Sequence, residues 1–284
     1  MNIPESIKRC FPTRAVDSHK GTYGTLLSVC GSYGMAGAAM LAARAAGRCG
    51  TGLVIAALPE SIYPIAAAQL PEVVFAPLKA HTCADDIQIL TPHLQKCTAL
   101  LIGCGLGNTA ATAQLTEALL SRTDGPVVLD ADGINAAARH ISILETAHPP
   151  LILTPHPKEL ARLLGCSVEQ VQTNRQAAAQ TAAARFDVIV VLKGHRTVIA
   201  DSNGGMYINE TGNPGMAVAG SGDVLAGMIA GLLAQGIPPW DATRCGVYLH
   251  GAAGDLAAER LSQRAMLPID ILDELGTLFL QLES

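Results

Sequence analysis

The sequence contains little charge and few aromatic residues. Of its 284 residues, 15% are charged and 4% are aromatic, whereas 49% are hydrophobic. Acidic residues outnumber basic ones and the net charge is -5, so the clustered basic surface of a nucleic-acid-binding protein is not expected. A chain of this length buries a large apolar core, which predicts a globular protein that meets anionic ligands with local groups.

The eight cysteines show no pairing pattern, since Cys-x-x-Cys does not occur and their spacing is irregular. This predicts reduced thiols in a cytoplasmic protein, and neither a disulfide framework nor a zinc knuckle. Long apolar runs are also missing: residues 1–13 have no apolar core, and the least charged stretch, 224–240, is short and broken by glycine and proline. Within this stretch, Gly227 and Gly231 have the small-xxx-small spacing, which indicates close helix packing in a soluble core. We therefore expect neither a signal peptide nor a contact with a membrane.

The common nucleotide-binding motifs are missing as well. A P-loop and the protein-kinase motifs are absent, and the glycines at 31, 34 and 37 do not match the dinucleotide fingerprint G-x-G-x-x-G. Instead, short apolar segments alternate with glycine-rich turns and helical stretches, which predicts an α/β fold with a mostly parallel central sheet. No repeat or linker divides the chain, so we expect a single domain over residues 1–284.

Apolar runs and turn residues give the expected elements. Strands are predicted at 25–30, 53–58, 73–76, 99–102, 127–129, 151–153, 188–192, 198–200 and 206–209. Helices are predicted at 38–49, 109–121, 158–165, 167–185, 224–235, 241–260 and after 268. Ligands of open parallel sheets lie beyond the carboxyl ends of the strands, and the glycine and aspartate clusters of this sequence fall there.

The glycine-rich segment 213–225 is the strongest candidate for an anion site. Gly220, Ser221 and Gly222 precede an apolar helix expected to begin near Asp223. Their free backbone N–H groups and the positive helix end would face one phosphate. Asp223 has two interpretations, as the N-cap of this helix or as a proton acceptor beside the anion.

Charged residues also follow two predicted strands. Asp130 and Asp132 either bind a cation or cap the next helix, and capping is preferred because Asp is common at helix starts. Lys193 offers a point charge for a phosphate and Thr197 a hydroxyl; the alternative is a solvated turn.

His156 stands between two prolines, which restrict its backbone and favour a contact with a ligand. Glu159 follows in the first turn of a predicted helix, where an acid is favourable in any case. Four features together predict phosphoryl transfer from a nucleotide to a hydroxyl group. They are the backbone N–H groups of Gly220 to Gly222 (the anion cradle), the acid beside them, the loop that contains Lys193, and the rigid His156. This reaction needs positioning, charge neutralisation and a proton acceptor.

Seven segments add a family resemblance that covers nearly the whole chain. They are 19–24 (HKGTYG), 37–39 (GAA), 103–107 (GCGLG), 129–135 (LDADGIN), 154–159 (TPHPKE), 193–197 (KGHRT) and 219–225 (AGSGDVL). In this order they resemble the ribokinase-like superfamily and, within it, the ADP-dependent NAD(P)H-hydrate dehydratases. The superfamily commonly has Asn where His156 stands, so the chain departs from sugar kinases and agrees with the dehydratase branch.

The resemblance implies a repair reaction with Mg²⁺ as cofactor. ADP would phosphorylate the hydroxyl of the S-form of hydrated NADH or NADPH, and elimination of phosphate would restore the reduced ring, leaving AMP. The residues implied to contact the hydrate are Ala38, Gly105, His156 and Asp223, with Asp223 as the general base. Those implied to contact the nucleotide are Lys193, Gly194, His195, Arg196, Thr197, Gly220, Ser221 and Gly222. Glu159 would keep the acidic position associated with magnesium.

The resemblance further implies a homotetramer in the cytoplasm and an epimerase activity supplied by a separate protein. ATP could replace ADP. Two other functions stay open at this point: a small-molecule kinase, which would release a stable phosphorylated product, and a non-catalytic nucleotide-binding module, in which Asp223 only caps its helix.

Overall fold

Short aliphatic runs form the strands, because a parallel strand buried on both faces carries apolar side chains at successive positions. The computed structural model describes residues 3–79, 82–145 and 150–283, so residues 1, 2 and 284 of the predicted domain lie outside the described part. The strands are β1 (Thr25–Val29), β2 (Leu53–Pro59), β3 (Val74–Leu78), β4 (Ala99–Ile102), β5 (Val127–Leu129), β6 (Leu151–Leu153), β7 (Ile189–Leu192), β8 (Val198–Ala200) and β9 (Met206–Ile208).

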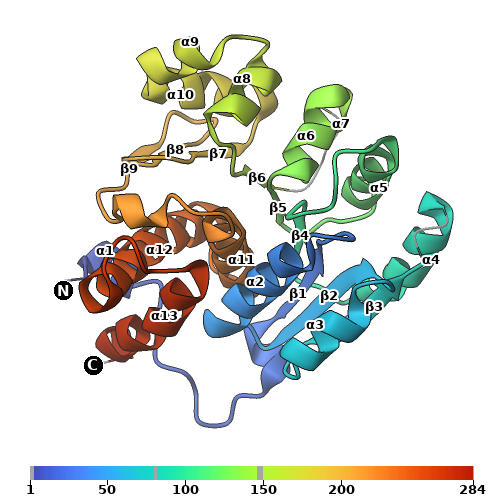
Figure 1. Ribbon diagram of the computed structural model, residues 1–284, viewed down its shortest axis with the longest axis horizontal. Coiled ribbons are helices and arrows are strands. Elements are labelled where there is room, and N and C mark those ends of the chain that lie inside the picture. The colour runs from blue at the N-terminus through green and yellow to red at the C-terminus, as the bar shows by residue number, and fades with distance from the viewer. Residues whose placement is uncertain (1–2, 80–81, 146–149, 284) are drawn as a thin grey trace.

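These strands form one sheet in the order β3-β2-β1-β4-β5-β6-β7-β8-β9 (Figure 1). The first seven strands run parallel, and β8 and β9 extend one edge as antiparallel neighbours. The chain builds outward from β1 to β3 and then returns to place β4 on the other side of β1. The strand order therefore reverses between β1 and β4, which is where open α/β sheets hold their ligands.

Helices cover both faces of the sheet, because successive side chains of each strand point to opposite sides. In β4, Leu101 joins one apolar core, whereas Leu100 and Ile102 join the other. The first core contains residues of α1 (Glu5–Lys8), α2 (Ala36–Arg48), α3 (Tyr63–Gln69), α11 (Ser221–Ala234), α12 (Pro239–Leu261) and α13 (Pro268–Glu283). The second contains residues of α4 (Cys83–Leu94), α5 (Ala110–Leu120), α6 (Asp132–Arg139), α7 (Ser142–Glu145), α8 (Pro157–Leu164), α9 (Val168–Thr173) and α10 (Arg175–Phe186). The predicted fold class is confirmed.

One predicted helix is wrong in its length. The segment 167–185 forms two helices, α9 and α10, with a break at Asn174. The Asn174 side chain accepts a hydrogen bond from the backbone N–H of Ala177 and so caps α10 instead of continuing α9. The helices α1, α3, α4 and α7, which are short or carry proline, were not predicted from the sequence.

Helix α11 lies almost fully buried between the sheet, α2 and α12. Close approach to α2 depends on two glycines: a Cβ atom at Gly227 would lie 2.2 Å from the carbonyl oxygen of Ala42, and one at Gly231 would lie 2.7 Å from the Cα of Ala46. The predicted role of this glycine pair in helix packing is confirmed. Its apolar surface serves this packing, and none of the described helices has both the length and the apolarity to cross a membrane.

Substitution of Gly227 tests this contact. We expect Gly227→Ala to lower the free energy of unfolding by about 1–3 kcal/mol, because the added methyl group forces α11 away from α2. Gly276→Ala is the control, since this position in α13 is exposed and has open space around a Cβ atom. The control should be neutral or stabilise by about 0.5–1 kcal/mol in chemical denaturation. Equal effects of the two substitutions would contradict the packing role.

Candidate active site

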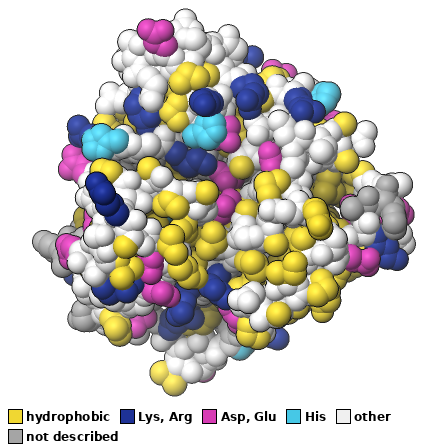
Figure 2. Space-filling view, in the orientation of Figure 1, with side chains coloured by type: hydrophobic (Ala, Val, Ile, Leu, Met, Phe, Trp, Pro, Cys, Tyr) yellow, Lys and Arg dark blue, Asp and Glu magenta, His cyan; other side chains and the backbone are white. Residues whose placement is uncertain are grey.

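Four neighbouring parallel strands have their carboxyl ends side by side, and a chemically active residue follows each of them. These residues are Cys104 after β4, Asp130 after β5, Thr154 after β6 and Lys193 after β7. The N-terminus of α11 approaches β4 and β5 at these carboxyl ends. Acidic side chains reach the surface where these two strands end, with basic and histidine side chains beside them (Figure 2).

Helix α11 begins earlier than predicted, at Ser221, and its N-cap is Gly220 with φ +97°. Asp223 therefore lies within the first helical turn, and the interpretation of Asp223 as the N-cap is wrong. A glycine fits the cap because this φ is unfavourable for any residue with a Cβ atom. The backbone N–H of Ser221 donates to the Val218 carbonyl oxygen at 3.3 Å, so the N–H groups of Gly220 and Gly222 are left for an anion at the positive end of α11.

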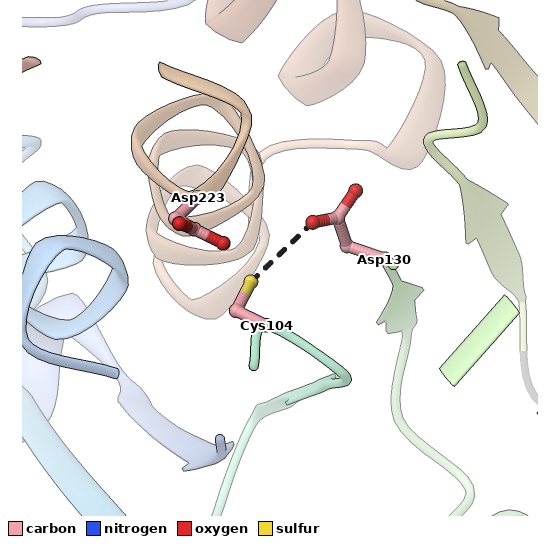
Figure 3. A group of neighbouring side chains, drawn as sticks. All are labelled: Cys104, Asp130 and Asp223. Atoms are coloured by element: carbon pink, nitrogen blue, oxygen red, sulfur yellow. Dashed lines mark hydrogen bonds between the residues drawn. The ribbon is translucent and has the colours of Figure 1, made fainter. Parts of the chain in front are cut away.

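Asp130 follows β5 and lies buried between the carboxyl ends of β4, β6 and β7, with 1% of its surface exposed. Its Oδ1 accepts hydrogen bonds from Lys193 Nζ and from Thr154 Oγ1, each at 2.6 Å. Its Oδ2 accepts from the Cys104 thiol at 3.5 Å (Figure 3). The N-cap position of α6 belongs to Ala131, so the preferred capping role of Asp130 is wrong. The carboxylate binds side chains from three neighbouring strand ends instead.

The capping role of Asp132 is also wrong, because this residue lies inside the first turn of α6. Its Oδ2 accepts a hydrogen bond of 2.7 Å from the backbone N–H of Gly107. Asp132 thus fixes the loop after β4 beside the start of α6.

Asp223 points toward Cys104 and Asp130 across the gap between α11 and the strands (Figure 3). A thiol sulfur and one oxygen of each carboxylate lie within 4.8 Å of one another. Burial raises the pKa of Asp223 to about 6, and the negative charge of Asp130 adds to this rise. A carboxyl group with this pKa is partly ionised near neutral pH and can accept a proton from a substrate hydroxyl.

Lys193 reaches from the end of β7 to the first turn of α11. A Cβ atom at Gly222 would lie 3.4 Å from Lys193 Nζ, so the ammonium group stands directly against the cradle. Burial works against its charge, but Asp130 and Glu159 outweigh burial and raise the pKa of Lys193. The solvated-turn alternative for Lys193 is therefore wrong.

The other residues of the 193–197 loop lie further toward solvent. Gly194, His195 and Arg196 are exposed, and Arg196 pairs with Glu210 at 3.1 Å. Thr197 donates a hydrogen bond to the carbonyl oxygen of Gly194, which closes the loop. The structure brings Lys193 to Asp130 and Asp223, the acidic centre of the site. Residues 194–197 form the rim of the site that lies toward solvent.

His156 and Glu159 cap α8 reciprocally. His156 Nδ1 accepts hydrogen bonds from the backbone N–H groups of Lys158 and Glu159, and Glu159 Oε2 accepts from the backbone N–H of His156. Burial raises the pKa of Glu159 to about 7. Burial and the nearby Lys193 lower the pKa of His156, whose side chain is about half exposed. The imidazole is thus neutral, rigid and open to a ligand.

Gly105 and Ala38 meet where the strand order reverses. Gly105 has φ +65°, and a Cβ atom there would lie 2.8 Å from the Cβ of Ala38. Ser32 donates a hydrogen bond to the Gly105 carbonyl oxygen, which joins the loops after β1 and β4. These two predicted substrate contacts lie together, on the α2 side of the acidic centre.

A cavity of about 720 Å³ lies elsewhere, between the N-terminal arm, the end of α2 and α13. Among its lining residues, Arg14 binds the Gly50 carbonyl oxygen and stacks on Tyr23, and Asp241 pairs with Arg244. The cavity shares no lining residue with the predicted site.

Sequence reasoning missed Thr154 and Cys104 and misassigned Asp130. All three closely follow a predicted strand, as many residues do, and they lie in the segments 103–107, 129–135 and 154–159 that carry the family resemblance.

The fold and this site define the class of protein as a ribokinase-like α/β protein. A solved ribokinase-like superfamily protein from Enterococcus faecalis matches with a TM-score of 0.87 and 28% identity, covering 99% of this chain and 95% of that one. The family model described as NAD(P)H-hydrate dehydratase matches residues 26–276. The chain belongs to this family, as the resemblance predicted.

Individual relatives agree with the family match. The chain is 46% identical over 253 residues to the ADP-dependent (S)-NAD(P)H-hydrate dehydratase of Neisseria meningitidis, covering 88% of this chain and 82% of the relative. A structure of the Bacillus subtilis ADP/ATP-dependent NAD(P)H-hydrate dehydratase, co-crystallised with ATP/Mg²⁺, matches with a TM-score of 0.85 and 35% identity, covering 98% and 96%. The chain spans about half (52%) of a bifunctional NAD(P)H-hydrate repair enzyme from Moorella thermoacetica, at 46% identity over 96% of this chain.

Gly222→Ala tests the anion cradle. The methyl group would make ordinary contact with Lys193 Nζ at 3.4 Å, so the fold should persist while the space for a phosphate narrows. We expect kcat/KM for ADP to fall by about 10–100-fold, because displacement of the phosphate misaligns the reacting atoms. Gly47→Ala in α2, where a Cβ atom has open space, is the control and should keep normal kinetics. Unchanged ADP kinetics in Gly222→Ala would remove the cradle from the site.

Proposed function

We propose that the chain catalyses the ADP-dependent dehydration of the S-form of hydrated NADH or NADPH, which gives NADH or NADPH, AMP and phosphate. The observation that carries this proposal is the position of Asp223: a carboxyl group with a pKa of about 6 in the first turn of α11, beside free backbone N–H groups and Lys193. The family membership and the names of its relatives support the same reaction.

In the proposed reaction the hydrate lies between Asp223 and the contact of Gly105 with Ala38, and His156 contacts it from the opposite side. Asp223 takes the proton of the substrate hydroxyl as that oxygen attacks the terminal phosphorus of ADP and AMP departs. The backbone N–H groups of Gly220 and Gly222 and the Lys193 ammonium stabilise the charge on the transferring phosphoryl group. The phosphate then leaves with the electrons of its C–O bond while the neighbouring ring carbon loses a proton to solvent, and the double bond that forms restores the reduced ring. The rim from Gly194 to Thr197 contacts the nucleotide.

The site offers Mg²⁺ few protein ligands, so the ion would be bound mainly by the nucleotide phosphates and by water. Glu159 is the carboxylate that would hold it, but one Glu159 oxygen already accepts the His156 N–H and the side chain is buried. Mg²⁺ commonly binds through one or two carboxylates together with substrate phosphates. When bound, it would neutralise charge on the nucleotide phosphates.

A small-molecule kinase is the second candidate, because the same cradle and base would serve it. A non-catalytic nucleotide-binding module is disfavoured by Asp223, which does not occupy the N-cap position. We also expect a homotetramer with reduced cysteines in the cytoplasm; the described cysteines are all free thiols. An epimerase partner remains a prediction.

Incubation of the protein with hydrated NADH, Mg²⁺ and ADP tests the reaction directly. The measurement is the return of the absorbance of the reduced nicotinamide. We expect recovery that depends on ADP. A stable phosphorylated product in its place would support the kinase, and nucleotide binding without turnover would support the module.

Asp223→Asn tests the base. We expect kcat to fall by about 10²–10⁴-fold with little change in ADP affinity, the usual contribution of a positioned proton acceptor. In the wild-type protein kcat should rise with pH through about 6, because only the ionised carboxylate accepts a proton. This rise of kcat with pH should disappear in Asp223→Asn. Because the pKa of Glu159 is also raised, to about 7, Glu159→Gln is the control, and the rise should persist in this variant. Near-normal turnover in Asp223→Asn would refute the assignment.

Glu159→Gln tests the metal role. The amide oxygen can still accept the His156 N–H, so the cap of α8 should remain. We expect the Mg²⁺ concentration for half-maximal rate to rise about tenfold, as for loss of an ion-orienting group. An unchanged Mg²⁺ requirement, with normal thermal stability, would show that Glu159 is only a cap.

A further inference from the structure

The ion pair between Lys193 and Asp130 lies inside the protein, with the two side chains 18% and 2% exposed and 2.6 Å between Nζ and Oδ1. Removing two opposite charges from water costs several kcal/mol per ion, which their attraction offsets only in good geometry. A buried pair is therefore weak evidence of a stabilising role. The position of the pair indicates what it does instead.

The pair lies where phosphate is expected. Lys193 Nζ stands against the first turn of α11 beside Gly222, so the ammonium and the free N–H groups of the helix face one space. Lysine has a flexible four-carbon stem, and Glu159 is a second carboxylate that attracts its charge. A further contact is needed to hold the Lys193 ammonium at α11 and to keep it from moving toward Glu159.

Asp130 has the contacts needed for this selection. Thr154 Oγ1 and the Cys104 thiol donate to its two oxygens from the strands on either side. The carboxylate is thus fixed before any ligand arrives, and its Oδ1 faces the ammonium. Electrostatic stabilisation of a transition state is most effective when the charged group needs no reorganisation during the reaction.

We propose that Asp130 is a positioning residue that holds the Lys193 ammonium at the N-terminus of α11, where Lys193 stabilises the transferring phosphoryl group. This rests on the proposed function for the identity of the phosphoryl donor. Asp130 does not touch the substrate and acts through Lys193.

A double-mutant cycle tests the proposal. Asp130→Asn keeps an acceptor for Lys193 and Thr154 but removes the charge, and we expect kcat to fall about 10–100-fold while KM for ADP changes less than about threefold. In a Lys193→Met background, Asp130→Asn should change kcat by less than about threefold, since no ammonium remains to be positioned. The same loss in both backgrounds would overturn the proposal.

Asp241→Asn is the matched control, because it also removes the carboxylate charge of a partly buried ion pair, Arg244–Asp241 at 3.3 Å, which lies outside the site. We expect kcat within about threefold of wild type. A loss as large as that of Asp130→Asn would point to a general effect of breaking an ion pair and would contradict a specific action through Lys193. Thermal denaturation of every variant identifies any that fails to fold.

A binding cycle keeps the proposal separate from the proposed function. Inorganic phosphate is titrated calorimetrically into protein saturated with AMP, which requires no turnover. We expect Asp130→Asn to weaken phosphate binding in the wild-type background and not in Lys193→Met. Wild-type protein without turnover would refute the proposed function alone, whereas equal effects of Asp130→Asn in both backgrounds would refute the positioning role alone.

Discussion

One buried carboxylate connects the parts of the site. Asp130 follows β5 and accepts hydrogen bonds from residues that follow β4, β6 and β7. Parallel strands bring these positions to the same edge of the sheet, although up to 89 residues separate Cys104 from Lys193 along the chain. The three partners of Asp130 offset part of the desolvation cost of this buried charge, and the carboxylate keeps the lysine charged in a region that excludes most water. The position of the Lys193 ammonium follows from this network.

Several groups in the site combine a structural and a chemical task. Glu159 and His156 complete the cap of α8, yet burial raises the pKa of Glu159 and lowers that of His156. Asp223 lies in the first turn of α11, where the helix dipole favours a negative charge, while burial opposes it. The balance leaves Glu159 and Asp223 able to exchange protons near neutral pH, which a solvent-exposed Asp or Glu does not do.

The scaffold fixes where the anion cradle lies. Gly227 and Gly231 let α11 approach the backbone of α2, and the sheet supports the other side of α11. The direction of α11, and hence of its free N–H groups, is set by this contact. Gly105, in the loop after β4, meets Ala38 in the first turn of α2, which brings these two predicted substrate contacts together. A tightly packed core thus controls geometry at the surface, because close-packed helices cannot shift independently.

The sequence by itself determined the strands, the alternation with helices, the glycine pair in α11 and the edge of the sheet where polar residues gather. Each of these depends on the spacing of residue types over a short stretch, which periodicity reports directly. The family resemblance added the identity of the chemistry. The tertiary structure alone decided the partners of charged side chains: Asp130 binds Lys193 and caps nothing, Asp223 lies inside a helix, and Cys104 and Thr154 join the site. Local sequence favours a cap for any Asp before a helix, whereas the actual partner depends on which strand ends the sheet brings together.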